Sequence, residues 1–249
     1  MLVENWMSKE VITIDVNDSM QHADKLMKEY SISRLPVMKK GELVGIFTDR
    51  DLKGASASDV NDLEIHEPLY LSSIIKVGGI MSKDPITVPP DYTLEETAEI
   101  LLNNRISGAP VVEDDGQVVG MITSKDLFGA MVPFTGVGKR GFQFGFLLED
   151  RPGSIKEAVG IIREYGGRIV SIMSTWQRAP KGYRRVNIRT YGISRLRIDR
   201  LTANLDSKTT LLYVIDHREN KREIFDNECR EHMQTAVANS RVGKNEGIS

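Results

Sequence analysis

The chain of 249 residues has little of the chemistry on which many protein classes depend. Its single cysteine, Cys229, excludes an internal disulfide, and its four histidines leave few nitrogen ligands for a dedicated metal centre. No apolar run approaches the roughly 20 residues needed to cross a bilayer. The first six residues have neither the basic start nor the apolar core of a signal peptide. We therefore expect a cytoplasmic protein with no metal site and no membrane partner.

The composition is otherwise that of a globular protein, with 40% hydrophobic, 27% charged and 6% aromatic residues. The length fits two or three domains. The formal net charge of −2 is unevenly spread, because residues 1–140 carry −8 and residues 141–200 carry +7. This change in charge coincides with a Gly-rich stretch, so the sequence predicts a linker over residues 133–141.

An internal repeat occupies the acidic part of the chain. A Met-Ser-Lys motif at residues 7–9 recurs at 81–83, and Ile-Ser-x-x-Pro-Val at 32–37 recurs at 106–111. The motif Gly-apolar-apolar-Thr-x-x-Asp at 45–51 recurs at 120–126. Strand and helix patterns between these motifs predict one β-α-β-β-α unit used twice.

These repeated motifs resemble the cystathionine-β-synthase-type (CBS) domain pair over about residues 1–132. The first repeat with its connecting loop is placed at 1–70 and the second at 71–132. The resemblance implies two units packed through their sheets, with two clefts related by a pseudo-twofold axis. It also implies a sensor that binds adenosine compounds.

The residue chemistry supports such a ligand. A carboxylate at a helix start, Asp51 or Asp126, suits the vicinal hydroxyls of a ribose, and the helix end favours an anion. The glycine of each motif leaves room for a ring to approach the backbone. The predicted nucleotide-binding residues are Thr13, Ile32, Arg34, Pro36, Thr48, Arg50, Asp51, Thr87, Ile106, Pro110, Thr123, Lys125 and Asp126. The isoleucines and prolines would face adenine, the threonines the base or sugar, and the basic residues phosphate.

Two alternatives remain open for these residues. The Thr-x-x-Asp motif also fits a helix capping box without any ligand. The small segment 107–109 favours the Asp126 cleft, whereas Arg34 favours the other cleft for a polyphosphate. The candidate ligands are AMP, ADP, ATP, NAD(H) and S-adenosylmethionine, and no cofactor is required.

The basic part of the chain has a second pattern. Residues 142–217 predict β-α-β-β-α-β, the ferredoxin-like order, with its second helix at 193–205. The Asp-Arg-Pro-Gly turn at 150–153 resembles that of an ACT domain, which implies an effector, often an amino acid, at Asp150, Arg151, Gly153, Ser154 and Ile155. A charged helix is expected at 218–238, followed by a disordered tail at 239–249.

The fold class is therefore α+β: a pair of CBS-type repeats followed by a ferredoxin-like ACT domain. This order resembles bacterial acetoin-utilisation B-type proteins (AcuB-like). It implies a homodimeric, non-enzymatic regulator that passes a nucleotide signal to a protein partner not identified by the sequence. Two other functions stay open: a nucleic-acid-binding regulator using basic residues 141–200, and an enzyme whose catalytic residues have no recognisable motif.

Overall fold

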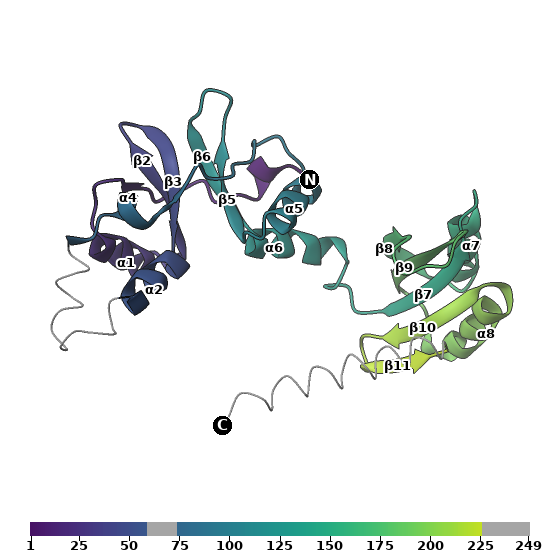
Figure 1. Ribbon diagram of the computed structural model, residues 1–249. Coiled ribbons are helices and arrows are strands. Elements are labelled where there is room, and N and C mark those ends of the chain that lie inside the picture. Colours follow the sequence, from purple (N-terminus) through teal and green to yellow (C-terminus); the bar gives the residue numbers. More distant parts are fainter. Residues whose placement is uncertain (59–73, 226–249) are drawn as a thin grey trace. The chain divides into compact units, whose positions relative to one another are not determined.

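The computed structural model describes residues 1–58 and 74–225, which form two compact units divided between Ala130 and Met131 (Figure 1). Residues 59–70 of the predicted first repeat lie outside these ranges. So do the whole of the predicted tail and most of the predicted C-terminal helix.

The first unit contains the two repeats. Its first repeat has the predicted β-α-β-β-α order, whereas the first strand predicted for the second repeat is a single bridge between Val88 and Val111. The first repeat comprises η1 (Val3–Asn5), β1 (Ile14–Asp15), α1 (Met20–Glu29), β2 (Arg34–Lys39), β3 (Glu42–Thr48) and α2 (Asp49–Ser58). The second comprises α4 (Val77–Ile80), β4 (Ser82–Lys83), α5 (Leu94–Asn103), β5 (Gly108–Val112), β6 (Val118–Thr123) and α6 (Ser124–Phe134).

Local chemistry explains where these elements begin and turn. Lys40 and Gly41 both have positive φ, as the two-residue turn of the β2–β3 hairpin requires. The hydroxyl of Ser19 accepts the His22 N–H at the start of α1. Thr93 and Glu96 form a reciprocal capping box at the start of α5.

The two repeats exchange their Met-Ser-Lys segments. The second repeat contributes β4 to the sheet of the first, ordered β1-β2-β3-β4, where β4 pairs antiparallel with β3. In the matching place, Ser8 exchanges backbone hydrogen bonds of 2.9 and 3.0 Å with Met121, beside the β5–β6 hairpin. Each repeat therefore carries one strand-like segment that belongs to the other.

This exchange corrects the role predicted for two glycines. A Cβ atom on Gly45 would lie 2.5 Å from Sδ of Met81, and one on Gly120 would lie 2.3 Å from Sδ of Met7. The space beside each glycine is thus filled by a methionine from the other repeat. The prediction that a ligand ring occupies this space is wrong.

The hydrophobic cores follow the same exchange. Val3 is fully buried in the core of the second repeat, and Val77 is fully buried in that of the first. Met7 and Met81 pack against these same two cores. The segment before the first repeat's helix thus completes the core of the second repeat. The segment before the second repeat's helix completes the core of the first.

The second unit has the predicted β-α-β-β-α-β order plus one strand. Its antiparallel sheet is ordered β11-β10-β7-β9-β8, and alternate residues of β7 face a core shared with α7 and α8. The elements are β7 (Phe142–Glu149), α7 (Ser154–Glu164), β8 (Arg168–Thr175), β9 (Tyr183–Tyr191), η2 (Arg195–Arg197), α8 (Ile198–Lys208), β10 (Thr210–Asp216) and β11 (Lys221–Ile224).

Three boundary predictions are corrected here. The helix predicted from residue 218 is wrong at Lys221–Ile224, which form β11 because all four residues pair with β10. The helix predicted from residue 193 begins at Ile198, after a 3-10 turn. The predicted linker starts too early, because α6 continues through Pro133 to Phe134.

Candidate ligand-binding clefts

Two clefts of the first unit are lined by residues of both repeats and have volumes of about 440 and 320 Å³. Both volumes fall in the range of small-molecule sites, about 300–1,000 Å³. The cleft that contains Asp126, here called the Asp126 cleft, is lined by Ser8, Glu10, Ile12, Ser31, Ile32, Ser33, Arg34, Ser107, Met121, Thr123, Ser124, Lys125 and Asp126. The Asp51 cleft is lined by Arg34, Ile46, Thr48, Asp49, Arg50, Asp51, Ser82, Lys83, Asp84, Pro85, Ile86, Arg105, Ile106, Ser107 and Gly108.

Each cleft is built by both repeats. Ile32 of the first repeat lines the Asp126 cleft, and Ile106 of the second lines the Asp51 cleft. Each isoleucine therefore lines the cleft that holds the carboxylate of the other repeat. The physical reason is the exchange of the Met-Ser-Lys segments, which carries Ser8 and Ser82 to the opposite hairpins.

The two carboxylates occupy equivalent positions at helix starts. Oδ2 of Asp51 accepts hydrogen bonds from the Thr48 N–H (2.8 Å) and hydroxyl (2.7 Å). Oδ2 of Asp126 accepts the same bonds from Thr123, at 2.8 and 2.6 Å. The capping alternative is therefore realised in both repeats. Within the described residues, Oδ1 of each carboxylate has no hydrogen-bond partner, so that oxygen is available to a ligand.

The predicted site residues divide into two groups. Nine of them line a cleft: Ile32, Arg34, Thr48, Arg50, Asp51, Ile106, Thr123, Lys125 and Asp126. Pro36 and Pro110 are instead buried within β2 and β5, and Thr13 and Thr87 are exposed outside both linings. The prolines belong to the hairpin strands, where the hydrophobic motif that contains them packs inward.

The sequence interpretation missed several residues that line the clefts. Arg105 and Lys83 lie within or beside the repeated motifs, so the repeat itself was the signal for them. Arg105 occupies the position in the second repeat that Ser31 occupies in the first. Its presence gives the Asp51 cleft a cation that the Asp126 cleft lacks at that position.

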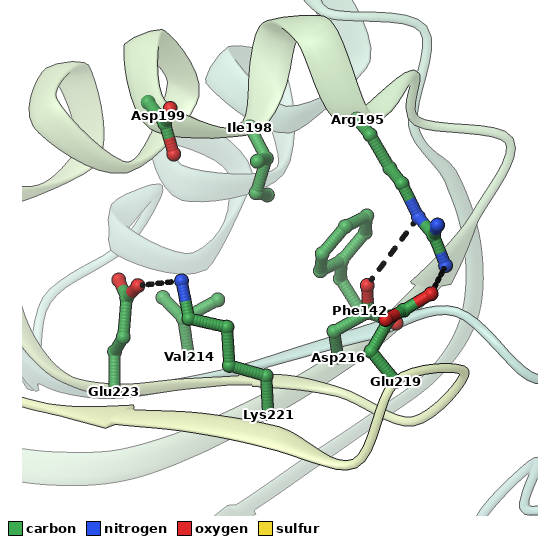
Figure 2. Close-up of a pocket in the computed structure, with 9 residues that line it drawn as sticks. All are labelled: Phe142, Arg195, Ile198, Asp199, Val214, Asp216, Glu219, Lys221 and Glu223. Carbon is green, nitrogen blue, oxygen red and sulfur yellow. Dashed lines mark ion pairs between the residues drawn. The ribbon is translucent and has the colours of Figure 1, made fainter.

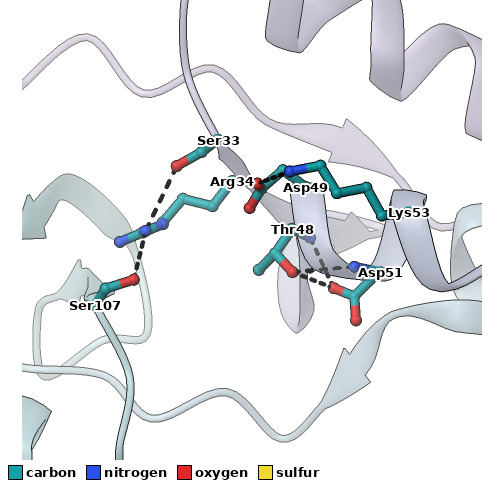
Figure 3. A network of polar contacts seen from close by, with 7 residues as sticks. All are labelled: Ser33, Arg34, Thr48, Asp49, Asp51, Lys53 and Ser107. Carbon is teal, nitrogen blue, oxygen red and sulfur yellow. Dashed lines mark hydrogen bonds and ion pairs between the residues drawn. The ribbon is translucent and has the colours of Figure 1, made fainter. Parts of the chain in front are cut away.

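Arg34 lies between the two clefts and lines both. Its Nη2 donates to Oγ of Ser107 at 2.8 Å and reaches Oγ of Ser33 at 3.5 Å (Figure 3). Burial lowers the pKa of the Arg34 guanidinium, while the charges of Asp49 and Asp126 act in the opposite direction. The side chain stays a cation, because the ordinary pKa of arginine is far above neutral pH.

Comparison with known proteins identifies this unit. A CBS domain model matches residues 3–58 and 77–133. A CBS domain-containing protein of Dictyostelium discoideum is 33% identical over 132 residues, which cover 53% of this chain and 91% of that protein. The chain belongs to the CBS domain family.

Other matches cover the same CBS part of the chain. Inosine-5′-monophosphate dehydrogenase of Korarchaeum cryptofilum is 37% identical over 125 residues, and the match spans 50% of this chain but only 23% of that enzyme. A solved structure of the CBS domain pair of protein MJ0100 holds 5′-methylthioadenosine and S-adenosyl-L-methionine. It is 31% identical, covers 53% of this chain and 99% of its own, and has a TM-score of 0.46.

The turn proposed to bind an effector lies in the other unit, and its charged groups have partners. Asp150 accepts hydrogen bonds from Trp176 Nε1 (2.8 Å) and Arg184 Nε (2.9 Å), and the bond from Arg184 lowers the pKa of Asp150. Arg151 bonds both oxygens of Glu157, at 2.8 and 2.7 Å. Gly153 precedes α7 with φ of 90°, a conformation that glycine adopts readily.

A third pocket of about 460 Å³ lies in this unit, between α8 and the β10–β11 hairpin (Figure 2). Phe142 and Val214 give it a buried apolar floor. Its two basic side chains already hold carboxylates: Arg195 pairs with Glu219 at 2.6 Å, and Lys221 pairs with Glu223 at 2.9 Å. The sequence interpretation did not foresee this pocket, because β11 was expected to be helical.

Residues 1–58 and 74–225 contain no helix with the length and apolar character to span a bilayer. The same ranges contain no group of three or more histidine, cysteine or acidic side chains suited to a metal ion.

Proposed function

We propose that the first unit is a regulatory sensor, not an enzyme, that binds an adenosyl ligand such as AMP in its CBS clefts. One observation carries the proposal: Asp51 and Asp126 stand at equivalent places in the two clefts, each with one oxygen engaged in the helix cap and Oδ1 available. Two structural caps alone would not require that both carboxylates line a cleft of ligand size.

The surroundings of each carboxylate suit the three parts of such a ligand. The free carboxylate oxygen accepts ribose hydroxyls. Ile12 and Ile32 offer apolar surface for a base in one cleft, and Ile86 and Ile106 do so in the other. Arg34 and the basic residue two positions after each threonine, Arg50 or Lys125, provide charge for a phosphate.

The test is calorimetry on the full chain with AMP, ADP, ATP, NADH, S-adenosylmethionine and 5′-methylthioadenosine. Asp51→Asn and Asp126→Asn keep an oxygen that can accept from the capping threonine, but they present an NH₂ group to the ligand. A hydrogen bond to a charged group contributes about 1.5–3 kcal/mol, so we expect each variant to weaken its own cleft about 10- to 100-fold.

Glu96→Gln is the matched control, because it neutralises the same kind of capping box at α5, away from both clefts. It should leave binding unchanged. The proposal is wrong if no compound binds at millimolar concentration, or if neither aspartate variant weakens what binds.

We further propose that the second unit is an ACT-type regulatory module, as in AcuB-like proteins, and that it forms a homodimer. Its sheet order, β10-β7-β9-β8 with two helices on one face, supports the module, and the turn 150–153 stands where the effector would bind. A ligand there would have to compete with the partners that Asp150 and Arg151 already hold.

Two measurements test this part of the proposal. Light scattering should give twice the chain mass. Calorimetry with an amino-acid panel should show binding that Asp150→Asn removes. A gel shift whose strength falls steeply with salt would instead favour the nucleic-acid alternative.

A further inference from the structure

The linings of the two CBS clefts share one hydrogen-bonded pair. Arg34 and Ser107 are the two residues that line both clefts, and Nη2 of Arg34 donates to Oγ of Ser107 at 2.8 Å. Figure 3 shows the arginine reaching from β2 across to the serine of the other repeat. A change in the position of the Arg34 side chain therefore alters both clefts.

The guanidinium is held there without a full set of partners. Its Nη1 is buried and has no hydrogen-bond partner among residues 1–58 and 74–225. A buried donor without a partner is unfavourable, and a phosphate oxygen is a strong acceptor for it. Asp49 in one cleft and Asp126 in the other act on this cation through charge, but within the described residues neither forms an ion pair with it. The Arg34 guanidinium can therefore donate a hydrogen bond from Nη1 to an anion.

The pseudo-symmetry cannot provide a second such arginine. Position 34 is equivalent to Gly108, and a Cβ atom on Gly108 would lie 1.8 Å from Nη1 of Arg34 and 2.9 Å from the carbonyl oxygen of Ile122. The glycine makes room for the arginine. The two clefts therefore share one arginine at this position, where full symmetry would give each cleft its own.

The two clefts depend on this cation unequally. Besides Arg34, the basic residue lining the Asp126 cleft is Lys125, whereas Arg50, Arg105 and Lys83 line the Asp51 cleft. A phosphate in the Asp51 cleft that takes the guanidinium would leave the Asp126 cleft with its single lysine. The second phosphate would also meet the remaining negative charge of the first.

We propose that Arg34 makes the two clefts compete for ligands that carry a phosphate. Binding of a phosphorylated adenosyl ligand in one cleft withdraws the guanidinium from the other and lowers its affinity. A phosphate-free adenosyl ligand fills both clefts independently. The inference rests on the proposed function and specifies how that site is regulated: the relative supply of phosphorylated and unphosphorylated ligand sets whether one or both clefts are filled.

The experiment compares AMP with 5′-methylthioadenosine by calorimetry on the full chain. Asp126→Asn and Asp51→Asn report the affinity of each remaining cleft alone. For AMP, the second binding step of the wild type should be about 5- to 150-fold weaker than those single-cleft affinities predict, which is the usual range of coupling between sites. For 5′-methylthioadenosine, the two steps should match the single-cleft values.

Three variants assign the coupling to the shared side chain. Arg34→Gln should make the two AMP steps independent. Arg50→Gln and Lys125→Gln, at equivalent positions that each line one cleft, should weaken AMP in their own cleft and leave the coupling in place. A thermal melt checks that each variant is folded.

The outcomes separate the two proposals. If both compounds bind but AMP fills the clefts independently or with positive coupling, the competition is wrong and the proposed function stands. Coupling that persists in Arg34→Gln also overturns it. If neither compound binds the wild type, the proposed function fails and this inference fails with it. The comparison of AMP with 5′-methylthioadenosine on the wild type and the two aspartate variants does not need Arg34→Gln, so it still decides the matter if that variant does not fold.

Discussion

Gly45 and Gly120 are small because each packs against a residue that is distant in sequence. Each faces the sulfur of a methionine from the other repeat, and the carbonyl oxygen of Ser82 would lie 2.8 Å from a Cβ atom on Gly45. A methionine side chain can move aside, but a strand carbonyl cannot do so without weakening the β3–β4 pairing.

We therefore expect Gly45→Ala to lower the free energy of unfolding by about 1–3 kcal/mol, the usual effect of overpacking. Urea denaturation measures it. Gly129→Ala is the control, because no atom lies within 4 Å of a Cβ atom there and alanine favours the helix by up to about 1 kcal/mol. Equal effects of the two substitutions would contradict this account of Gly45.

His217 gives a pH dependence to the second unit. Burial lowers its pKa, and the positive charges of Arg189 and Arg222 lower it further, while Asp216 acts in the opposite direction. Its Nε2 lies 3.0 Å from Oε1 of Gln143, so the neutral ring with a proton on Nε2 fits as donor.

Because the folded pKa is the lower one, the unfolded chain binds the proton more readily. The stability of the second unit should therefore fall as pH decreases below about 6.5, the ordinary histidine pKa, towards the folded value. His217→Gln should remove this part of the pH dependence in urea denaturation between pH 5 and 8. An unchanged slope in the variant would show that other groups cause it.

At the scale of single residues, the sequence predicted the polar half of the clefts. Thr48, Asp51, Thr123 and Asp126 could be found because the repeated motif and helix-start chemistry point to them. The grouping of the apolar residues could not be found, because it depends on which hairpin each Met-Ser-Lys segment joins. Long-range strand pairing makes that choice. The repeat in the sequence fits equally well whether each Met-Ser-Lys segment pairs with its own hairpin or with the other one.

The helices α1 and α5 of the first unit begin at side-chain caps, and the box at α5 is a measurable example. The Thr93 hydroxyl accepts the Glu96 N–H at 3.2 Å, and the Glu96 carboxylate accepts the Thr93 N–H at 2.8 Å. The backbone bond from Thr93 lowers the pKa of Glu96, as expected for a carboxylate that is stabilised in its charged form.

Thr93→Ala should cost about 1 kcal/mol of unfolding free energy, the typical effect of losing such a cap, whereas Thr93→Ser should keep most of it. Urea denaturation of both variants at pH 7 checks this. A serine variant as unstable as the alanine variant would mean that the methyl group of the threonine, and not its hydroxyl, matters at this position.

The elements with strong periodicity were predicted well, and those without it were not. The hairpins β2–β3 and β5–β6 and the helix α7 lie where apolar spacing and turn residues placed them. Strand β11 was missed because Lys221, Arg222 and Glu223 form a charged run with no alternation of apolar residues. Pairing with β10, and not an intrinsic preference, makes this segment extended.

At the scale of the whole molecule, the two units have separate cores. The core of the second unit is drawn from residues between Phe142 and Val214, and the two cores of the first unit are drawn from residues up to Ala130. Phe146, which is fully buried, lies at the centre of β7.

Phe146→Ala should destabilise the second unit by about 3–5 kcal/mol, the usual cost of removing a buried aromatic ring. Hydrogen exchange read by mass spectrometry should then rise in peptides from residues 142–216 and stay unchanged in those from 20–48. Faster exchange in both sets would show that the units unfold together.

The bridge between Ser8 and Met121 joins residues 113 positions apart, and β3 and β4 join residues 45 and 83. During synthesis, an emerging chain that ends anywhere before the second hairpin has no complete cleft, because each lining needs residues from both repeats. The proposed adenosyl ligands therefore cannot stabilise a chain that ends before this hairpin. The lining of the Asp51 cleft ends at Gly108 and that of the Asp126 cleft at Asp126, so termination products that end before the second hairpin should be indifferent to the nucleotide supply.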